Sequence, residues 1–339
     1  MIKSKVKDIA KTATLENVKI TANKVIVGEG VKLKNVHVEA SSLVVGRDSS
    51  INDAILLSNG TIEIGKLVQI KEESVLKAFK RVKIGDRTII GRGVVVAGLQ
   101  SERSCFEVGS RCVVLHHTYI NNVWEVIIGN NVGIGGYCMI FTHGVWQNVF
   151  KGYPYKFGKV EIKDDAWLPW HVFVMPGVTI GKGATIAGGS VVTRDIPDYC
   201  LAAGVPAKII RQENYPAQLI NEEKNTLAKT VLRDFEGYFR NFIGNKSIRL
   251  NELSEGATIV SSDVGNFVYA SKAEPEQLND PDLTSLKRFD IVSFTIPQAL
   301  KDQHRWVELD TETRSPIVSK LTNEFVQFLR RYGVRVIEE

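Results

Sequence analysis

The sequence predicts a mainly β chain, in which stacked parallel coils of short strands precede an α+β domain. A six-residue period runs through residues 1–211, and no helix has that period. The glycines are concentrated in the same part of the chain, since 23 of the 28 lie in residues 1–211. Beyond residue 211, apolar residues take helical spacing in two stretches, which predicts a different kind of domain.

The period is densest from Ile162, where six consecutive hexads follow one another without a break. Each begins with an aliphatic residue, and the fifth position of each is small or β-branched. The first positions are Ile162, Leu168, Val174, Ile180, Ile186 and Val192, and the fifth are Ala166, Val172, Val178, Ala184, Ser190 and Ile196. Further copies start at Ile84 and Ile128, with weaker ones at Val27, Val45, Ile64 and Val108. We expect both positions to point inward, with Gly, Asp and Asn at the corners between short strands.

Charge also separates two parts of the chain. Residues 1–211 hold 27 Lys+Arg and 18 Asp+Glu, whereas residues 212–339 hold 16 and 20. The 339 residues leave room for two domains, predicted as 1–211 and 212–339. The overall charge of +5 is too small to indicate nucleic-acid binding by itself.

The sequence favours a reduced, cytoplasmic protein. No apolar run reaches the ~18 residues of a membrane span. Residues 1–15 carry lysines and lack the apolar core of a signal peptide. The four cysteines form no CxxC pair, so free thiols are expected.

Breaks in the period indicate where binding groups lie. Ile140 and Ile162 are 22 residues apart, which is not a multiple of six, so a loop must leave the coils there. The loop carries Trp146 and four other aromatic residues. A second break lies at residues 97–106, and a two-residue slip lies between Ile120 and Ile128. Loops on a rigid scaffold commonly carry function.

Residues 178–211 read VTIGKGATIAGGSVVTRDIPDYCLAAGVPAKIIR. Together with the hexads, this segment resembles the hexapeptide-repeat acyltransferases, in particular their sugar O-acetyltransferase branch. The resemblance implies a left-handed parallel β-helix solenoid, an exception to the usual right-handed crossover. It also implies a homotrimer, with the pantetheine arm of acetyl-CoA in a groove between neighbouring subunits.

The same resemblance gives His143 a catalytic role. In that family, a His at the start of such a loop is the general base. Neutral imidazole removes the proton of an acceptor hydroxyl or amine while that group attacks the thioester of an acyl-coenzyme A. No covalent enzyme intermediate and no metal is expected.

The family motifs also supply candidates for the acetyl-CoA groove. Glycine permits close backbone approach, and Arg binds phosphate well. Trp170 lies one nominal coil before Gly188, where it would line or partly block the groove. The cofactor-binding candidates are Trp170, Gly188, Gly189, Thr193, Arg194, Lys208 and Arg211.

Acceptor-side candidates are His117, Asn122 and the loop residue Trp146. His117 and Asn122 fall where the sugar acetyltransferases often have Asn and Asp. His116, His117, Asn121 and Asn122 are all candidates for orienting His143. Exposed corner positions explain the same residues without any functional role.

The function predicted is acetylation of a hydroxyl on a saccharide or nucleotide-linked sugar. N-acetylation of an amino sugar is the alternative within that class. A zinc hydrase of the same fold needs three His, two of them close in sequence, but the next His after His143 is His171. A non-catalytic ligand-binding or scaffold solenoid is the alternative from another class.

The domain at 212–339 is predicted to be α+β. Residues 216–242 and 316–332 have helical spacing, and Pro316 suits a helix start. Residues 257–260, 266–270 and 290–296 read as strands. No catalytic motif is present, so acceptor recognition or assembly is the expected role.

Overall fold

The structure is a computed structural model that describes residues 1–99, 101–253, 257–270 and 288–338. The chain divides into two compact units, Met1–Ala217 and Gln218–Glu339. The division falls six residues after the boundary predicted at 211.

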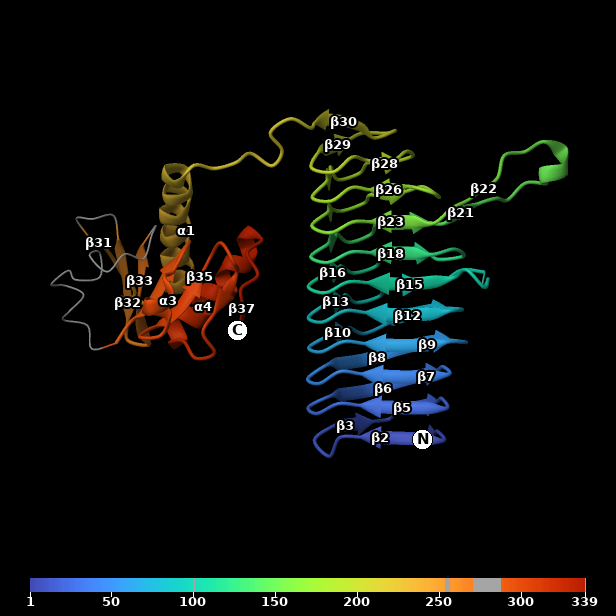
Figure 1. The fold of residues 1–339 in the computed structure, drawn as a ribbon, viewed down its shortest axis with the longest axis horizontal. Coiled ribbons are helices and arrows are strands. Elements are labelled where there is room, and N and C mark those ends of the chain that lie inside the picture. Colours follow the sequence, from blue (N-terminus) through green and yellow to red (C-terminus); the bar gives the residue numbers. More distant parts are fainter. Residues whose placement is uncertain (100, 254–256, 271–287, 339) are drawn as a thin grey trace. The chain divides into compact units, whose positions relative to one another are not determined.

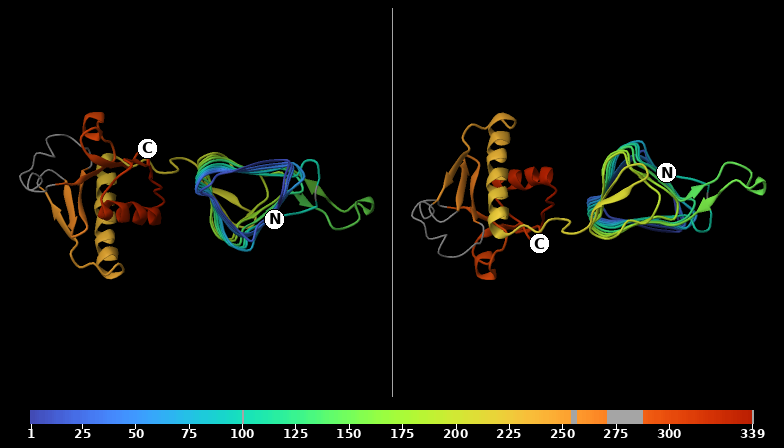
Figure 2. Two further views of the ribbon diagram at one scale, coloured as in Figure 1. Left: turned by 90° about the horizontal axis from the view of Figure 1, so that it is seen from below. Right: turned by 90° about the horizontal axis from the view of Figure 1, so that it is seen from above.

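The first unit is mainly β, with parallel sheets, and its strands stack in successive coils (Figure 1). Seen along the stack, each coil has a triangular outline with three faces (Figure 2). The first face is a sheet of nine strands: β2 (Val6–Ile9), β5 (Lys24–Val27), β7 (Ser42–Val45), β9 (Thr61–Ile64), β12 (Arg81–Ile84), β15 (Cys105–Val108), β18 (Val126–Ile128), β23 (Val160–Ile162) and β26 (Thr179–Ile180).

The other two faces belong to one larger sheet, because β6 (Lys32–Glu39) and β8 (Ser50–Ser58) run across both. The second face continues with β3 (Thr14–Glu16), β10 (Gln69–Ile70), β13 (Ile89–Ile90), β16 (Val113–Val114), β19 (Gly133–Ile134), β24 (Trp167–Leu168), β27 (Thr185–Ile186) and β29 (Leu201–Ala203). The third face continues with β1 (Ile2–Lys3), β4 (Lys19–Thr21), β11 (Ser74–Ala78), β14 (Val95–Val96), β17 (Tyr119–Asn121), β20 (Met139–Phe141), β25 (Phe173–Val174) and β28 (Val191–Val192). The antiparallel strand β30 (Lys208–Arg211) pairs with β29.

The hexad pattern sets the core of this unit. All six first positions from Ile162 to Val192 are fully buried. The six fifth positions are buried as well, with at most 5% exposure. Both predicted inward positions are therefore confirmed, and one coil's side chains cover those of the next.

Extra residues gather at one corner of the coils. Paired residues on the first face are 18 positions apart at Val25 and Leu43. The separation grows to 24 at Val82 and Phe106, and to 34 at Val126 and Val160. The additional residues project where the third face meets the first, as the hairpin and a smaller loop do in Figure 2. The predicted loop after Ile140 is confirmed.

A first prediction concerns the tight stacking at glycine corners. A Cβ on Gly85 would lie only 2.5 Å from the backbone carbon of Gly109 in the next coil. Gly85→Ala should therefore lower the free energy of unfolding by about 1–3 kcal/mol, the usual range for overpacking. Urea unfolding measures this change in the free energy of unfolding. Gly237→Ala is the control, because nothing lies within 4 Å of that position and alanine favours a helix. An equal loss in both variants would contradict the stacking argument.

The second unit combines helices with a seven-stranded mixed sheet. Helices α1 (Asn221–Asn241), α3 (Gln298–Lys301) and α4 (Lys320–Leu329) accompany the 3-10 turn η3 (Arg330–Tyr332). The strands are β31 (Arg249–Glu252), β32 (Thr258–Ser262), β33 (Gly265–Ala270), β34 (Asp290–Ser293), β35 (Arg305–Glu308), β36 (Thr313–Arg314) and β37 (Ile337–Glu338). Strands β33, β34 and β35 are parallel neighbours. Phe235 of α1 packs on Phe325 of α4 at 5.1 Å between ring centroids.

Both predicted helices exist with shorter bounds. The expected start at Pro316 is wrong, because α4 begins at Lys320 after an N-cap at Ser319, whose Oγ accepts a hydrogen bond from Thr322 N at 3.1 Å. Across the described residues, no helix is both long and apolar enough to cross a membrane. All four cysteines are free and buried.

Candidate active site

His143 stands where the hairpin leaves the third face. The strand β20 ends at Phe141, and β21 (His143–Gly144) then pairs with β22 (Lys156–Phe157), with the 3-10 turn η1 (Val149–Lys151) between them. Thr142 is fully buried at the departure point, and its Oγ1 donates to Asn121 O at 2.8 Å. The Oγ1 of Thr142 also accepts a hydrogen bond from Trp124 N at 3.0 Å. The root of the hairpin is thus fixed to the coil that precedes it.

Asn121 orients the His143 ring. The Nδ1 of His143 lies 2.7 Å from Asn121 Oδ1, and Asn121 Nδ2 donates to the hydroxyl of Tyr119 at 3.3 Å. Because an amide oxygen only accepts, this network assigns the proton to Nδ1 of neutral His143. The lone pair of Nε2 is then available to accept a proton. Asn121 is buried, and a Cβ on Gly98 would lie only 3.2 Å from its Oδ1, so Gly98 allows the amide to pack closely.

Aromatic rings cover one side of the imidazole. The ring of Phe157, on the returning strand of the hairpin, stacks on His143 with 5.8 Å between centroids. Trp124 lies 6.0 Å from Phe157, and the guanidinium of Arg103 lies 3.9 Å above Trp124. Residues from all three irregular segments at this corner therefore build the surroundings of His143. His143 itself remains partly exposed.

A second cluster occupies the corner between the second and third faces. The ring of His117 lies 5.2 Å from Tyr137, which stacks on His171 at 5.5 Å. His116 lies 4.9 Å from Trp170. The backbone positions of His117, Tyr137 and His171 all have positive φ, near 60°, so they form one column of corner residues. The structure thus places His117 beside Trp170 and not beside His143.

The two glycines of the predicted groove lie directly above this cluster. The backbone N–H of Gly189 donates to Trp170 O at 3.0 Å, and a Cβ on Gly188 would lie 3.3 Å from that oxygen. Both glycines are exposed, and Trp170 is 44% exposed. An aromatic face and bare backbone therefore adjoin in successive coils, as the 18-residue spacing predicts.

The remaining donor candidates lie farther along the stack. Thr193 is half-buried just after β28, and Arg194 beside it is exposed. Lys208 and Arg211 are exposed at the two ends of β30. Within the part of the chain that the structure describes, none of these three cations forms a salt bridge. They offer positive charge that no carboxylate of the described residues pairs with.

The structure corrects the expectation for Asn122. That side chain is fully buried, and its Nδ2 donates to Lys77 O at 2.8 Å and to Ser104 Oγ at 3.3 Å. It ties three coils together at the corner and cannot reach an acceptor. The polar contact with His143 comes from its neighbour Asn121 instead. Trp146, by contrast, is 97% exposed on the hairpin.

His143 and the groove glycines lie at opposite ends of the third face. His143 follows β20, whereas Trp170 and His171 precede β25, and these two strands are parallel neighbours. Crossing the face from His117 to Asn121 takes four residues, or roughly 13 Å at the rise of a β-strand. Between the two ends, Tyr119, Phe141 and Phe173 form a row of outward rings, with 5.1 Å between the last two.

Among the described residues, no group of three or more His, Cys, Asp or Glu is arranged to hold a metal ion. Burial raises the pKa of the Cys105 thiol to about 11 and also raises the pKa values of Cys138 and Cys200. These thiols therefore stay protonated near neutral pH, which disfavours them as nucleophiles.

Comparison with known proteins identifies acetyltransferases, although no family model matches the chain. A "putative acetyltransferase" of Staphylococcus aureus (strain COL) is 46% identical over 70 residues, which are 20% of this chain and 35% of that protein. A "probable acetyltransferase" of Mycobacterium tuberculosis is 26% identical over 217 residues, which are 60% of this chain and 61% of that protein. The chain thus spans only about a third of the first relative and three fifths of the second.

Among solved structures, a hexapeptide-repeat acetyltransferase of Vibrio cholerae, in complex with acetyl-coenzyme A, is 23% identical. The matched region covers 38% of this chain and 70% of the Vibrio cholerae protein, with a TM-score of 0.34. Both curated relatives carry the name acetyltransferase, as the resemblance stated for the hexads of this chain predicts.

Proposed function

We propose that this protein transfers an acetyl group from acetyl-CoA to a hydroxyl of a saccharide or nucleotide-linked sugar. The observation that carries the proposal is the contact between His143 and Asn121, which leaves Nε2 as a base at the root of an exposed hairpin. The acceptor class rests on the sequence resemblance. The proposal includes a left-handed parallel β-helix for the coils and a cytoplasmic location.

Direct transfer fits the chemistry of the site. His143 Nε2 removes the proton of the acceptor hydroxyl while that oxygen attacks the thioester carbonyl carbon. A new C–O bond forms, and the tetrahedral intermediate then expels the thiolate by breaking the C–S bond. The imidazolium returns its proton to the departing sulfur. Asn121 holds the ring throughout, because its Oδ1 accepts the Nδ1 hydrogen in both protonation states.

The donor is proposed to lie along the column of Trp170, Gly188 and Gly189. Bare backbone at the two exposed glycines lets a narrow pantetheine chain approach closely. The cations Arg194, Lys208 and Arg211 suit the phosphates of coenzyme A, and Thr193 adds a hydroxyl beside them. The exposed Trp146 of the hairpin and the ring of His117 are proposed acceptor contacts.

We propose that two copies of the chain bring the base His143 and the donor groove together. The base and the groove glycines stand a full face apart in one chain, so we propose that His143 of one copy faces Gly188 of a neighbour in a homotrimer. Sedimentation should then give three times the 37.7 kDa chain mass. A stable monomer would contradict a shared site.

Subunit mixing tests the shared site more sharply. His143→Ala removes the base, and Gly188→Trp fills the groove, so each variant alone should be inactive. Co-expressed chains should recover about one quarter of wild-type activity, because random assembly pairs an intact His143 with an intact Gly188 at that frequency. Mixtures that stay inactive would show that both residues must come from one chain.

The activity itself is tested by thiol release from acetyl-CoA with a panel of saccharides, amino sugars and nucleotide-linked sugars. Turnover with a neutral saccharide supports the proposal. Turnover confined to amino sugars would indicate N-acetylation, and binding of acetyl-CoA without turnover on any acceptor would indicate a scaffold. For the second unit, we propose acceptor recognition or assembly.

A further inference from the structure

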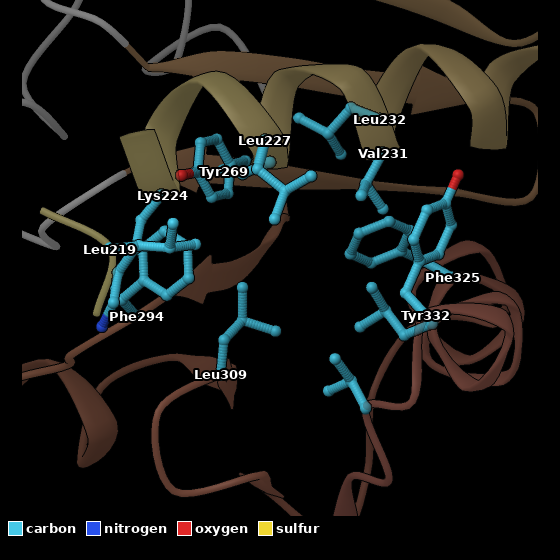
Figure 3. Close-up of a pocket in the computed structure, with 13 residues that line it drawn as sticks. Leu219, Lys224, Leu227, Val231, Leu232, Tyr269, Phe294, Leu309, Phe325 and Tyr332 are labelled. Atoms are coloured by element: carbon cyan, nitrogen blue, oxygen red, sulfur yellow. The ribbon is translucent and has the colours of Figure 1, made fainter. Parts of the chain in front are cut away.

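A cavity of about 270 Å³ lies in the second unit, apart from the proposed active site. It opens between helix α1, the end of helix α4 and the carboxyl ends of three parallel strands (Figure 3). Tyr269, Phe294 and Leu309 come from the ends of β33, β34 and β35 in turn. The carboxyl edge of parallel strands is the usual place for a ligand in α/β sheets.

The wall of the cavity is almost wholly apolar. Leu227 and Val231 of α1 line it together with Phe325 and Leu329 of α4. The polar atoms nearby already have partners. The hydroxyl of Tyr269 donates to Asn225 Oδ1 at 3.1 Å. Among the lining residues that the structure describes, the side-chain polar atoms of Tyr269, Lys224 and Tyr332 all have partners, which disfavours a polar group or a peptide backbone that needs hydrogen bonds when buried.

The mouth of the cavity is apolar as well. Leu219 and Leu227 are 43% and 50% exposed, and Tyr332 is 43% exposed. A ligand with a hydrocarbon portion would remove these surfaces from water. One cation stands at the rim, since Lys224 Nζ lies 3.0 Å from Asp310 and 5.2 Å from the ring of Phe294. The rim therefore carries a paired cation and carboxylate, which suits a polar end that remains in solvent.

We infer that this cavity binds the unbranched hydrocarbon chain of a medium-chain carboxylate or acyl group. A cavity of 150 Å³ holds the six carbons of benzene, so 270 Å³ holds about ten or eleven. The chain fills the apolar interior, and its polar end stays in solvent beside Lys224 and Asp310. All residues that line the cavity belong to the second unit, whereas His143 and the groove glycines belong to the first.

The test is calorimetric titration of the full chain with hexanoate, octanoate and decanoate below their micellar concentrations. Affinity should rise roughly fourfold for each added methylene across this series, because decanoate still fits the cavity. Ala228→Phe places a ring in the cavity and should weaken decanoate binding at least tenfold. Thr230→Phe adds the same bulk on the exposed side of α1 and should leave binding unchanged.

Three results would overturn the inference. Decanoate gives no saturable heat, or it binds Ala228→Phe as well as the wild type, or that variant alters the association state of the ligand-free protein. The last result would mean that a second copy covers the cavity. If Ala228→Phe does not fold, Leu219→Asp decides, because this exposed residue precedes the helix and a carboxylate there should weaken decanoate binding.

Discussion

His143→Ala is expected to lower turnover by about 10²–10⁴-fold, the usual contribution of a general base. Acetyl-CoA binding should stay unchanged, because the proposed donor contacts are the groove glycines, Trp170 and the exposed cations, and not the imidazole. Steady-state thiol release measures the rate, and calorimetry measures binding. The residual activity should no longer fall at low pH, since the group that must be deprotonated is gone.

His37→Ala is the matched control for this variant. His37 lies on β6, far down the stack, with its Nε2 2.8 Å from Glu39. Its loss should leave turnover within the error of the assay. Wild-type turnover in His143→Ala would remove the base from the mechanism, whatever the binding results.

Asn121→Ala is expected to lower turnover by roughly 10–10²-fold, because the ring loses the partner that fixes its tautomer and orientation. Asn121→Asp should recover much of that rate, since a carboxylate oxygen can accept the same hydrogen bond. The carboxylate also stabilises the protonated imidazole, so the acid limb of the pH–rate profile should move to higher pH in this variant.

A purely structural role for Asn121 predicts something else. The Asp and Ala variants would then lose stability and activity in parallel, and the acid limb would not move. Asn59→Ala serves as the control for removing an exposed amide from the coils. Unfolding measured beside turnover separates the two outcomes.

Much of the first unit follows from its sequence. Aliphatic residues every six positions favour short strands with these residues inward, and the six first positions from Ile162 to Val192 are buried as predicted. The interruption after Ile140 likewise predicts a loop, because 22 residues cannot be divided into hexads. These features depend on local pattern, which a single sequence contains.

The residue that orients His143 depends on something the pattern does not contain. Asn121 and Asn122 are adjacent, and the two extra residues at this corner decide which amide turns toward the hairpin. Asn121 meets the ring, while Asn122 binds Lys77 and Ser104 of earlier coils. A shift of one position in the assignment therefore confuses Asn121, which contacts His143, with Asn122, which has a structural role.

The second unit was less predictable for a similar reason. The strand β35 reads RWVE and is almost wholly buried, so it shows neither alternation nor helical spacing. Its place in the sheet is set by pairing with β34, which lies 15 positions away. The cavity beside these strands depends on the pairings of β33 with β34 and of β34 with β35, so no single segment of the sequence predicts it.

All the irregular segments leave the coils at one corner, and the strand pairing in the rest of each coil stays regular. After 16 residues more than the usual 18, Val160 still pairs with Val126, and the next pair, Glu161 and Thr179, is again 18 apart. Hairpin length is thus decoupled from the folding of the wall that carries it. Residues 145–156 form a cassette that can be shortened, extended or exchanged to change what reaches His143, at little expense in stability.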